Sequence, residues 1–183
     1  MRCLREQPLA AFLDSVRLKN GRNFRDDFID GIAVTRLIVP IMSSYALERM
    51  ISMTEQSDVD NLLVEWILTL ILHDIDSAAV RVLPVMLGPM AVVTATTVEP
   101  TRLPFPSDSI QRLPEVVPVK TLEVVRAALA RLDIVPTAPI ELTVREVVSR
   151  LALFQAYRPK NETHASIIAT ACDDKVLAIH IYL

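Results

Sequence analysis

Three groups of residues in this chain of 183 could do chemistry: acids close in sequence, histidines with cysteines, and serines in loops. Asp26, Asp27 and Asp30 are spaced closely enough to act as paired carboxylates or to bind a cation. Acids just before a helix more often cap its first turn and interact favourably with its dipole, and we interpret these three in that way. We expect no catalytic residue among them.

The histidines and cysteines do not form a metal-binding pattern. His73, His164 and His180 are scattered, and no pair of His or Cys residues has the spacing of metal ligands. Cys3 and Cys172 fit neither a disulfide framework nor a zinc motif. We therefore predict no metal and no cofactor. Because nothing demands an oxidising compartment, and the N-terminus lacks the apolar core of a secretory signal, we expect a cytoplasmic, intracellular protein.

The remaining nucleophiles and glycines do not indicate an active site either. Ser107 and Ser109 lack the surroundings of a nucleophile elbow, and three glycines in the whole chain cannot form a phosphate-binding loop. We predict that the chain is not an enzyme. A small enzyme is the second alternative, and it would need a concave pocket that collects carboxylates or histidines.

Apolar spacing indicates helices in the first half of the chain. Residues 9–18 have helical periodicity, and Asp30 with Gly31 is expected to open a helix that continues towards Ile41 and is limited by Pro40. Ser57 and Asp60 resemble a capping box before residues 59–72, which are apolar nearly all round. Such a helix is normally central in a bundle.

Two residues of that central helix stand out. Trp66, the only tryptophan, is expected to be a core anchor, and Glu65 would need a partner or a path to water. After the helix, Asp76 and Ser77 are expected to cap a further helix that runs through Leu83.

A proline-rich segment divides the chain. Five prolines fall within residues 99–120, which forbids a continuous helix and favours an extended linker. Beyond it, a stripe of apolar residues predicts a helix over 121–132. Thr143 and Glu146 form a T-x-x-E capping box that opens a helix to about Tyr157.

The last residues alternate in character with a period of two. Ile179, Ile181 and Leu183 alternate with Ala178, His180 and Tyr182, which predicts a strand, and the acid pair Asp173 and Asp174 predicts a tight turn before it. A hairpin at this position would present an exposed edge, so Ile179, Ile181 and Leu183 are candidate partner-binding residues.

These elements predict a mainly α fold: a compact helical bundle, a Pro-rich linker, two further helices and a C-terminal β-hairpin. The expected divisions are a helical domain over 1–98, a linker over 99–119 and a C-terminal region over 120–183.

Charge is distributed unevenly although the net charge is only −3. Residues 1–25 carry six basic and two acidic residues, whereas residues 26–76 carry two basic and ten acidic residues. The basic piece Arg17, Lys19, Arg22 and Arg25 could contact an acidic partner. It lacks a stacking platform of aromatic residues, so we do not expect a nucleic-acid interface.

The apolar content is high, at 51%, and it favours self-association or a permanent partner. It does not indicate a membrane span. The uncharged stretch over 82–98 is shorter than the roughly 20 residues of a spanning helix and contains Pro84, Gly88 and Pro89.

Residues 27–38 (DFIDGIAVTRLI) match an acidic-hydrophobic-x-Asp-Gly-x-x-aliphatic-x-x-Leu-aliphatic pattern. With the order of helices around it, the segment of about 8–95 resembles a divergent calponin-homology domain. It departs from that family at Phe12, where a Trp is usual, and at Pro84 and Pro89, where the last core helix is usually unbroken. Residues 99–183 lie outside the resemblance.

The resemblance implies a non-enzymatic binding module of the kind used by cytoskeletal and ciliary proteins. It favours a microtubule or adaptor role, in which Arg17, Lys19, Arg22 and Arg25 would face the acidic surface of a microtubule. We therefore expect an interaction module, an adaptor or scaffold subunit. The first alternative is a building block of a large assembly such as a viral capsid, in which the terminal strand reaches a neighbour.

Overall fold

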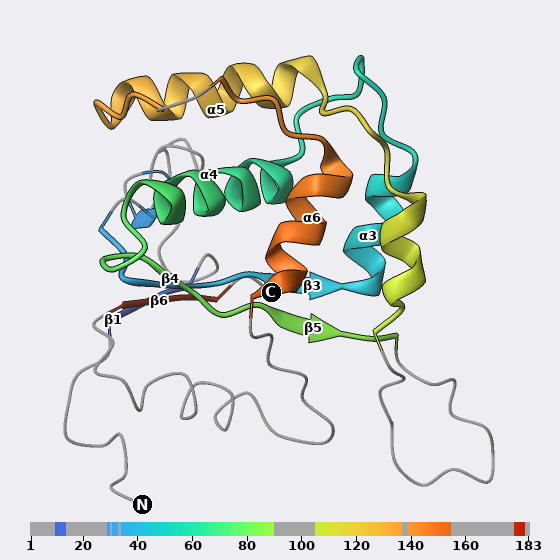
Figure 1. The fold of residues 1–183 in the computed structure, drawn as a ribbon, viewed down its shortest axis with the longest axis horizontal. Helices are drawn as coiled ribbons and strands as arrows, with labels where there is room; N and C mark the ends of the chain where they lie inside the picture. The colour runs from blue at the N-terminus through green and yellow to red at the C-terminus, as the bar shows by residue number, and fades with distance from the viewer. Residues whose placement is uncertain are drawn as a thin grey trace, which may run out of the picture.

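The computed structural model describes residues 10–13, 29, 31–32, 34–89, 105–136, 139–154 and 178–181. These residues form an α/β fold. Its strands are parallel, and the helices lie on one side of them (Figure 1).

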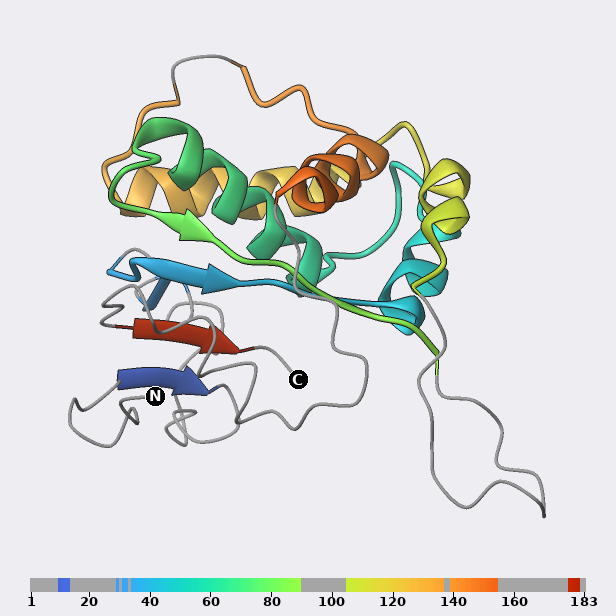
Figure 2. The ribbon, with the colours of Figure 1, turned by 60° about the horizontal axis from the view of Figure 1, so that its bottom comes forward.

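The main sheet has four parallel strands in the order β1-β6-β2-β4. They are β1 (Ala10–Leu13), β6 (Ala178–Ile181), β2 (Leu37–Val39) and β4 (Arg81–Val82). Figure 2 shows β1 and β4 at opposite edges of this sheet. A second parallel pair consists of β3 (Ile41–Ser43) and β5 (Val85–Leu87).

The two sheets are joined by a continuous ladder of hydrogen bonds. Arg81 N donates to Arg36 O at 2.8 Å, Leu83 N to Ile38 O at 2.9 Å, and Val85 N to Pro40 O at 2.8 Å. Pro40 falls between β2 and β3, where it lacks an N–H to donate but still accepts through its carbonyl. The β2–β4 pair and the β3–β5 pair therefore form one continuous ladder.

Burial explains why this region is extended. Leu37, Ile38 and Val39 are all buried, as expected for a parallel strand that is covered on both faces. Such a strand is apolar at every position, so its sequence does not alternate.

Helix α3 (Ser44–Ile51) begins directly after β3, where the Ser43 side chain accepts a hydrogen bond from Ala46 N. Helix α4 (Asn61–Ile75) follows, and the Asp60 side chain caps it by accepting from Leu63 N. Arg49 joins the two helices through an ion pair with Asp60 at 2.7 Å.

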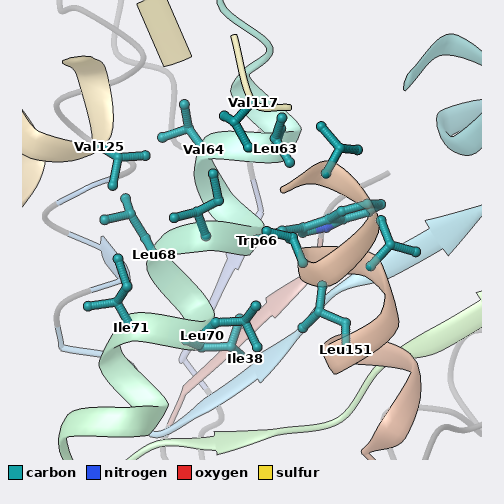
Figure 3. Packing of buried hydrophobic residues seen from close by; sticks show 14 of the residues in the cluster. Ile38, Leu63, Val64, Trp66, Leu68, Leu70, Ile71, Val117, Val125 and Leu151 are labelled. Atoms are coloured by element: carbon teal, nitrogen blue, oxygen red, sulfur yellow. The ribbon is translucent and has the colours of Figure 1, made fainter. Parts of the chain in front are cut away.

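Helix α4 is the central element of the core. Trp66 is 1% exposed, and the ten residues from Leu63 to Leu72 are all buried. Figure 3 shows Val64, Leu68 and Ile71 on the side of α4 that faces Val125, while Trp66 lies on the other side with Leu151. The expected central, nearly all-apolar helix with a buried Trp66 is confirmed.

The later helices complete that core. They are the 3-10 helix η2 (Ser107–Arg112), α5 (Val119–Arg131) and α6 (Val144–Leu153). Both α5 and α6 pack on α4. Leu113 and Val117, within the segment expected to be a linker, are also buried in the core. The predicted helix over 121–132 and the Thr143–Glu146 capping box are confirmed.

The expected compact helical bundle with a C-terminal hairpin is wrong, because strands β1 to β6 pair in parallel. The terminal strand exists, but it pairs with β1 on one side and β2 on the other. Strand β6 is an interior strand because it is paired on both sides. Its partners come from the first quarter of the chain and not from a preceding hairpin arm. Asp173 and Asp174, the predicted turn, lie outside the described residues.

The expected helix from Asp30 towards Ile41 is also wrong. Ile29 is already helical, and the helix gives way to a turn at Val34. Thr35 closes that turn by donating from N to Ile32 O at 3.2 Å and from Oγ1 to Gly31 O at 2.7 Å. Gly31 therefore lies near the end of a helix, and β2 and β3 follow it.

Three smaller expectations also fail. Residues 10–13 form β1 and not part of a helix. The cap of α4 is Asp60 itself, while Ser57 Oγ accepts from Thr54 N in the preceding turn. Asp76 Oδ1 accepts from Ala78 N and Ala79 N, which makes a tight turn into β4 where a helix was expected.

Candidate functional site

An ion pair joins the last turns of α4 and α6. Arg150 Nη2 donates to Asp74 Oδ1 at 2.6 Å and to Oδ2 at 2.7 Å. The side chain of Arg150 is 38% exposed and that of Asp74 is 49% exposed, so solvent reaches the pair. A single guanidinium nitrogen of Arg150, Nη2, makes both contacts.

His73 anchors this end of α4 to two other elements. Its Nδ1 lies 2.8 Å from Val80 O, and since a carbonyl only accepts, Nδ1 must carry the proton. The ring also meets Phe154 edge to face, with centroids 4.9 Å apart and planes at 83°. The end of α4, the start of β4 and the end of α6 are therefore held together here.

Two hollows adjoin the ion pair. The first has a volume of about 190 Å³ and is lined by Ile71, Asp74, Ile75, Pro136, Pro139, Ile140, Glu141, Leu142 and Arg150. The second, about 290 Å³, is lined by His73, Asp74, Arg150, Leu153 and Phe154. Asp74 and Arg150 belong to both. We call the residues that line these two hollows the α4–α6 surface.

Large apolar side chains at and beside the α4–α6 surface are unusually exposed. Leu153 is 85% exposed and Ile75 is 48% exposed. Val135, which adjoins Pro136 in the sequence, is 83% exposed. Apolar side chains gathered around an arginine and two hollows are typical of protein-binding surfaces.

Acidic groups border the first hollow. Glu141 lines it, and Asp76 follows two residues after Asp74; both are exposed. Within the described part of the chain, neither carboxylate forms an ion pair with a basic side chain, whereas Asp74 is neutralised by Arg150. Glu141 therefore adds one negative charge to the wall of the first hollow.

A buried glutamate lies away from this surface. Glu65 is 4% exposed, in the first half of α4.

The direction of α4 relative to the strands follows from its contacts. Helix α3 starts at the carboxyl end of β3, and Arg49 of α3 contacts Asp60 at the start of α4. The first turns of α4 therefore lie towards the carboxyl ends of the strands, and its last turn, held to Val80 by His73, lies towards their amino ends.

Most of the residues predicted from the sequence to bind partners lie outside the described residues, and the others belong to β6. Arg17, Lys19, Arg22, Arg25 and Leu183 lie outside the described residues. Ile179 pairs in register with Ala11 and Leu37, and Ile181 with Leu13 and Val39. The strand edge through which these two residues were expected to bind is thus already paired on both sides.

Sequence reasoning missed the α4–α6 surface altogether. Asp74 and Arg150 are 76 residues apart, and neither belongs to a local motif. Leu153 gave the one signal in the sequence. It is apolar, but it departs from the core-facing spacing that the buried apolar residues of its helix follow.

Two further findings concern the described residues only. No group of three or more His, Cys, Asp or Glu side chains there is arranged to hold a metal ion. None of the helices there combines the length and the apolar character that crossing a membrane requires.

Comparison with known proteins leaves the fold and the surface as the only guides to function. A scan against protein-family models and searches of curated proteins and of solved structures found no match to this chain. Fold and surface together define an α/β protein with a parallel sheet and an apolar, partly charged surface at one end of its helical layer.

Proposed function

We propose that this protein is an interaction module, an adaptor or scaffold subunit, that binds a protein partner through the α4–α6 surface. The observation that carries the proposal is the exposure of Leu153 at 85% beside the Asp74–Arg150 ion pair. Exposed aliphatic groups lose contact with water when a partner covers them, and a central arginine adds directional contacts.

The shape of the surface supports the same function. Two hollows that share one ion pair can each receive a side chain from a partner, while the ion pair fixes the orientation between them. The contacts of His73 with Val80 and Phe154 hold this end of the molecule in place before binding. A preformed site loses less conformational entropy when it binds.

Site-specific crosslinking tests the proposal. A photoreactive amino acid at position 153 should capture a protein, either another chain or a second copy, and capture should be lost with Asp74→Ala plus Arg150→Ala. Position 34 is the matched control, because Val34 is also apolar and 77% exposed but lies elsewhere. Equal capture from both positions, or none from position 153, would contradict the proposal.

A small enzyme is the second candidate function, and burial of Glu65 favours it. Burying a carboxylate is costly, and proteins often accept that cost at catalytic sites. Glu65 also lies on the part of α4 nearest the carboxyl ends of the strands, the edge at which parallel α/β sheets usually bind ligands. There, a buried carboxyl group can act as a general acid or base.

Incubation with a mixture of small metabolites, read by mass spectrometry, tests this second function. An enzyme should change the mixture, and Glu65→Gln should abolish the change while the melting temperature stays near that of the wild type. Glu123→Gln, an exposed change on α5, is the control. A mixture that the wild type leaves unaltered would exclude this function for the compounds present.

A further inference from the structure

We propose that the first hollow of the α4–α6 surface receives a lysine side chain of the protein partner. This inference rests on the proposed interaction function and names the group that the partner presents. The size of the hollow, its apolar walls and its charges each favour that group.

The walls of the first hollow are largely aliphatic. Ile71 and Ile75 are four residues apart, so they share one face of α4. The segment that precedes α6 adds Ile140 and Leu142. The occupant must therefore have an apolar stem that can lie against these side chains.

The hollow has room for one side chain and not for a large ligand. Its volume is about 190 Å³, whereas pockets for drug-sized ligands begin at roughly 300 Å³. Pro136 and Pro139 line it and restrict the main chain there, and Glu141 N donates to Pro139 O at 3.0 Å. This wall is therefore formed before an occupant enters.

The charges on the walls favour a cation. Arg150 Nη2 contacts both carboxylate oxygens of Asp74, at 2.6 Å and 2.7 Å, so the charges of these two residues offset each other. Glu141 is exposed, and within the described part of the chain it forms no ion pair. One negative charge therefore remains on the walls. It would repel a carboxylate or a phosphate and attract a single positive charge.

Lysine combines the stem and the charge that this hollow requires. Its unbranched four-carbon stem can lie against the isoleucines while the compact ammonium group stays beside the exposed carboxylate. The ammonium group has three donors, and a carboxylate can accept several hydrogen bonds, so Glu141 and Asp74 can both contact it. An arginine would bring a larger, planar head into a hollow of this size.

The surroundings of the hollow favour a partner over a lysine of the same molecule. Lys120, the only lysine among the described residues, is held by Asp58 at 2.6 Å at the start of α5. A lone side chain in the hollow would leave Leu153, which is 85% exposed, uncovered. Because Asp74 and Arg150 line both hollows, a partner surface that presents a lysine can cover the hollow and Leu153 together.

Titration of the full chain with n-butylammonium chloride tests the chemistry of the hollow. This probe is the stem and the head of a lysine side chain, and it should shift the methyl NMR signals of Ile71, Ile75 and Ile140 until they saturate. Two reference probes should bind more weakly: 1-butanol, which has no charge, and methylammonium, which has no stem. Binding should also be weaker at about 500 mM salt than at about 50 mM. Pentanoate that binds as well as butylammonium, or butylammonium shifts that never saturate, would overturn the inference.

Two substitutions should change the affinity for butylammonium in opposite directions. Glu141→Gln removes the remaining negative charge and should weaken binding about two- to fivefold, while Arg150→Gln removes the counter-charge of Asp74 and should tighten it. Glu55→Gln is the matched control. Glu55 is an exposed acid whose carbonyl accepts from Val119 N at the start of α5, away from the α4–α6 surface, and its variant should bind like the wild type.

The melting temperature of each variant verifies that it is folded. A folded Glu141→Gln chain that binds butylammonium like the wild type, or a folded Arg150→Gln chain that binds it more weakly, would overturn the inference.

Capture from position 153 connects the hollow to the partner. Glu141→Gln should reduce that capture. A carbodiimide joins a carboxylate to an amine in contact with it, forming an amide and taking up the released water as a urea. Applied to the captured complex, it should link Glu141 to a lysine of the captured protein, which mass spectrometry identifies. A link from Glu141 to a lysine of the same molecule would overturn the assignment to a partner.

The outcomes separate this inference from the interaction function. Capture from position 153 that does not respond to Glu141→Gln would overturn the lysine and leave the interaction function standing. Failure of the capture itself would remove the interaction function, and the partner's lysine with it.

Discussion

The guanidinium of Arg145 holds the carbonyl of Leu113 with two hydrogen bonds, from Nε at 3.1 Å and from Nη2 at 2.9 Å. Its Nη1 pairs with Glu115. Leu113 is fully buried, so this arginine satisfies a main-chain oxygen at the edge of the core and ties η2 to the first turn of α6.

Replacing Arg145 should therefore destabilise the fold. Arg145→Ala leaves the Leu113 carbonyl without these donors, and we expect a loss of about 1 to 3 kcal/mol in the free energy of unfolding. Urea denaturation followed by the fluorescence of Trp66 measures it, because that single tryptophan is buried in the folded state. Glu115→Gln, which removes only the exposed ion pair, should cost less than 1 kcal/mol; an equal loss in both variants would contradict this role.

The end of α5 offers a stabilising substitution. Asp133 has φ of 53°, and the bonds from Asp133 N to Ala130 O and from Ile134 N to Leu129 O form a Schellman motif. Glycine adopts this left-handed conformation without steric cost, so Asp133→Gly should stabilise the protein by about 1 kcal/mol. Thermal unfolding should show a higher midpoint. Asp133→Ala is the control and should not raise it, since alanine gains no freedom at positive φ.

The cap of α6 should contribute through two reciprocal hydrogen bonds. Thr143 Oγ1 accepts from Glu146 N at 3.1 Å, and Glu146 Oε2 accepts from Thr143 N at 2.8 Å. Thr143→Ala should cost about 1 kcal/mol, and Thr143→Ser should cost clearly less because the hydroxyl remains. Denaturant midpoints of the two variants distinguish them. If alanine and serine were equally tolerated, the capping contact would contribute nothing.

The Asp58–Lys120 contact predicts a pH effect at the start of α5. A hydrogen bond from Lys120 Nζ at 2.6 Å, together with the lysine charge, lowers the pKa of Asp58 below its ordinary 3.8. A lowered folded-state pKa stabilises the fold above the ordinary pKa, and this contribution is lost as the pH falls through the folded-state pKa. NMR titration of the Asp58 carboxyl carbon should show the lowered pKa, and Lys120→Gln should return it towards 3.8. A pKa indifferent to Lys120→Gln would refute the cause.

The helices that could be predicted from the sequence are those with a local signal. Helix α6 carries a capping box, and α4 is a long apolar segment with a polar start, so both were recognisable without knowledge of their neighbours. The strands β2 and β3 had no such signal. Leu37, Ile38 and Val39 are buried on both faces, and an unbroken apolar run also fits one side of a helix.

The pairing of the strands and the α4–α6 surface depend on distant parts of the chain. Ile179 alternates with polar or small neighbours as a strand residue should, but nothing local shows that its partners are Ala11 and Leu37. Arg150 and Asp74 likewise meet only because α6 packs on α4. Local patterns identified the segments, and long-range packing determined what they build.

The position of β6 has a consequence for biosynthesis. Residues 178–181 lie between β1 and β2, and among the described residues β6 is the only strand that pairs with β1. A ribosome makes these residues after β1 and β2, so β1 cannot form this pairing until they have been added. Closing a contact across such a span of chain is slow, so completion of the four-stranded sheet should be a late step in folding.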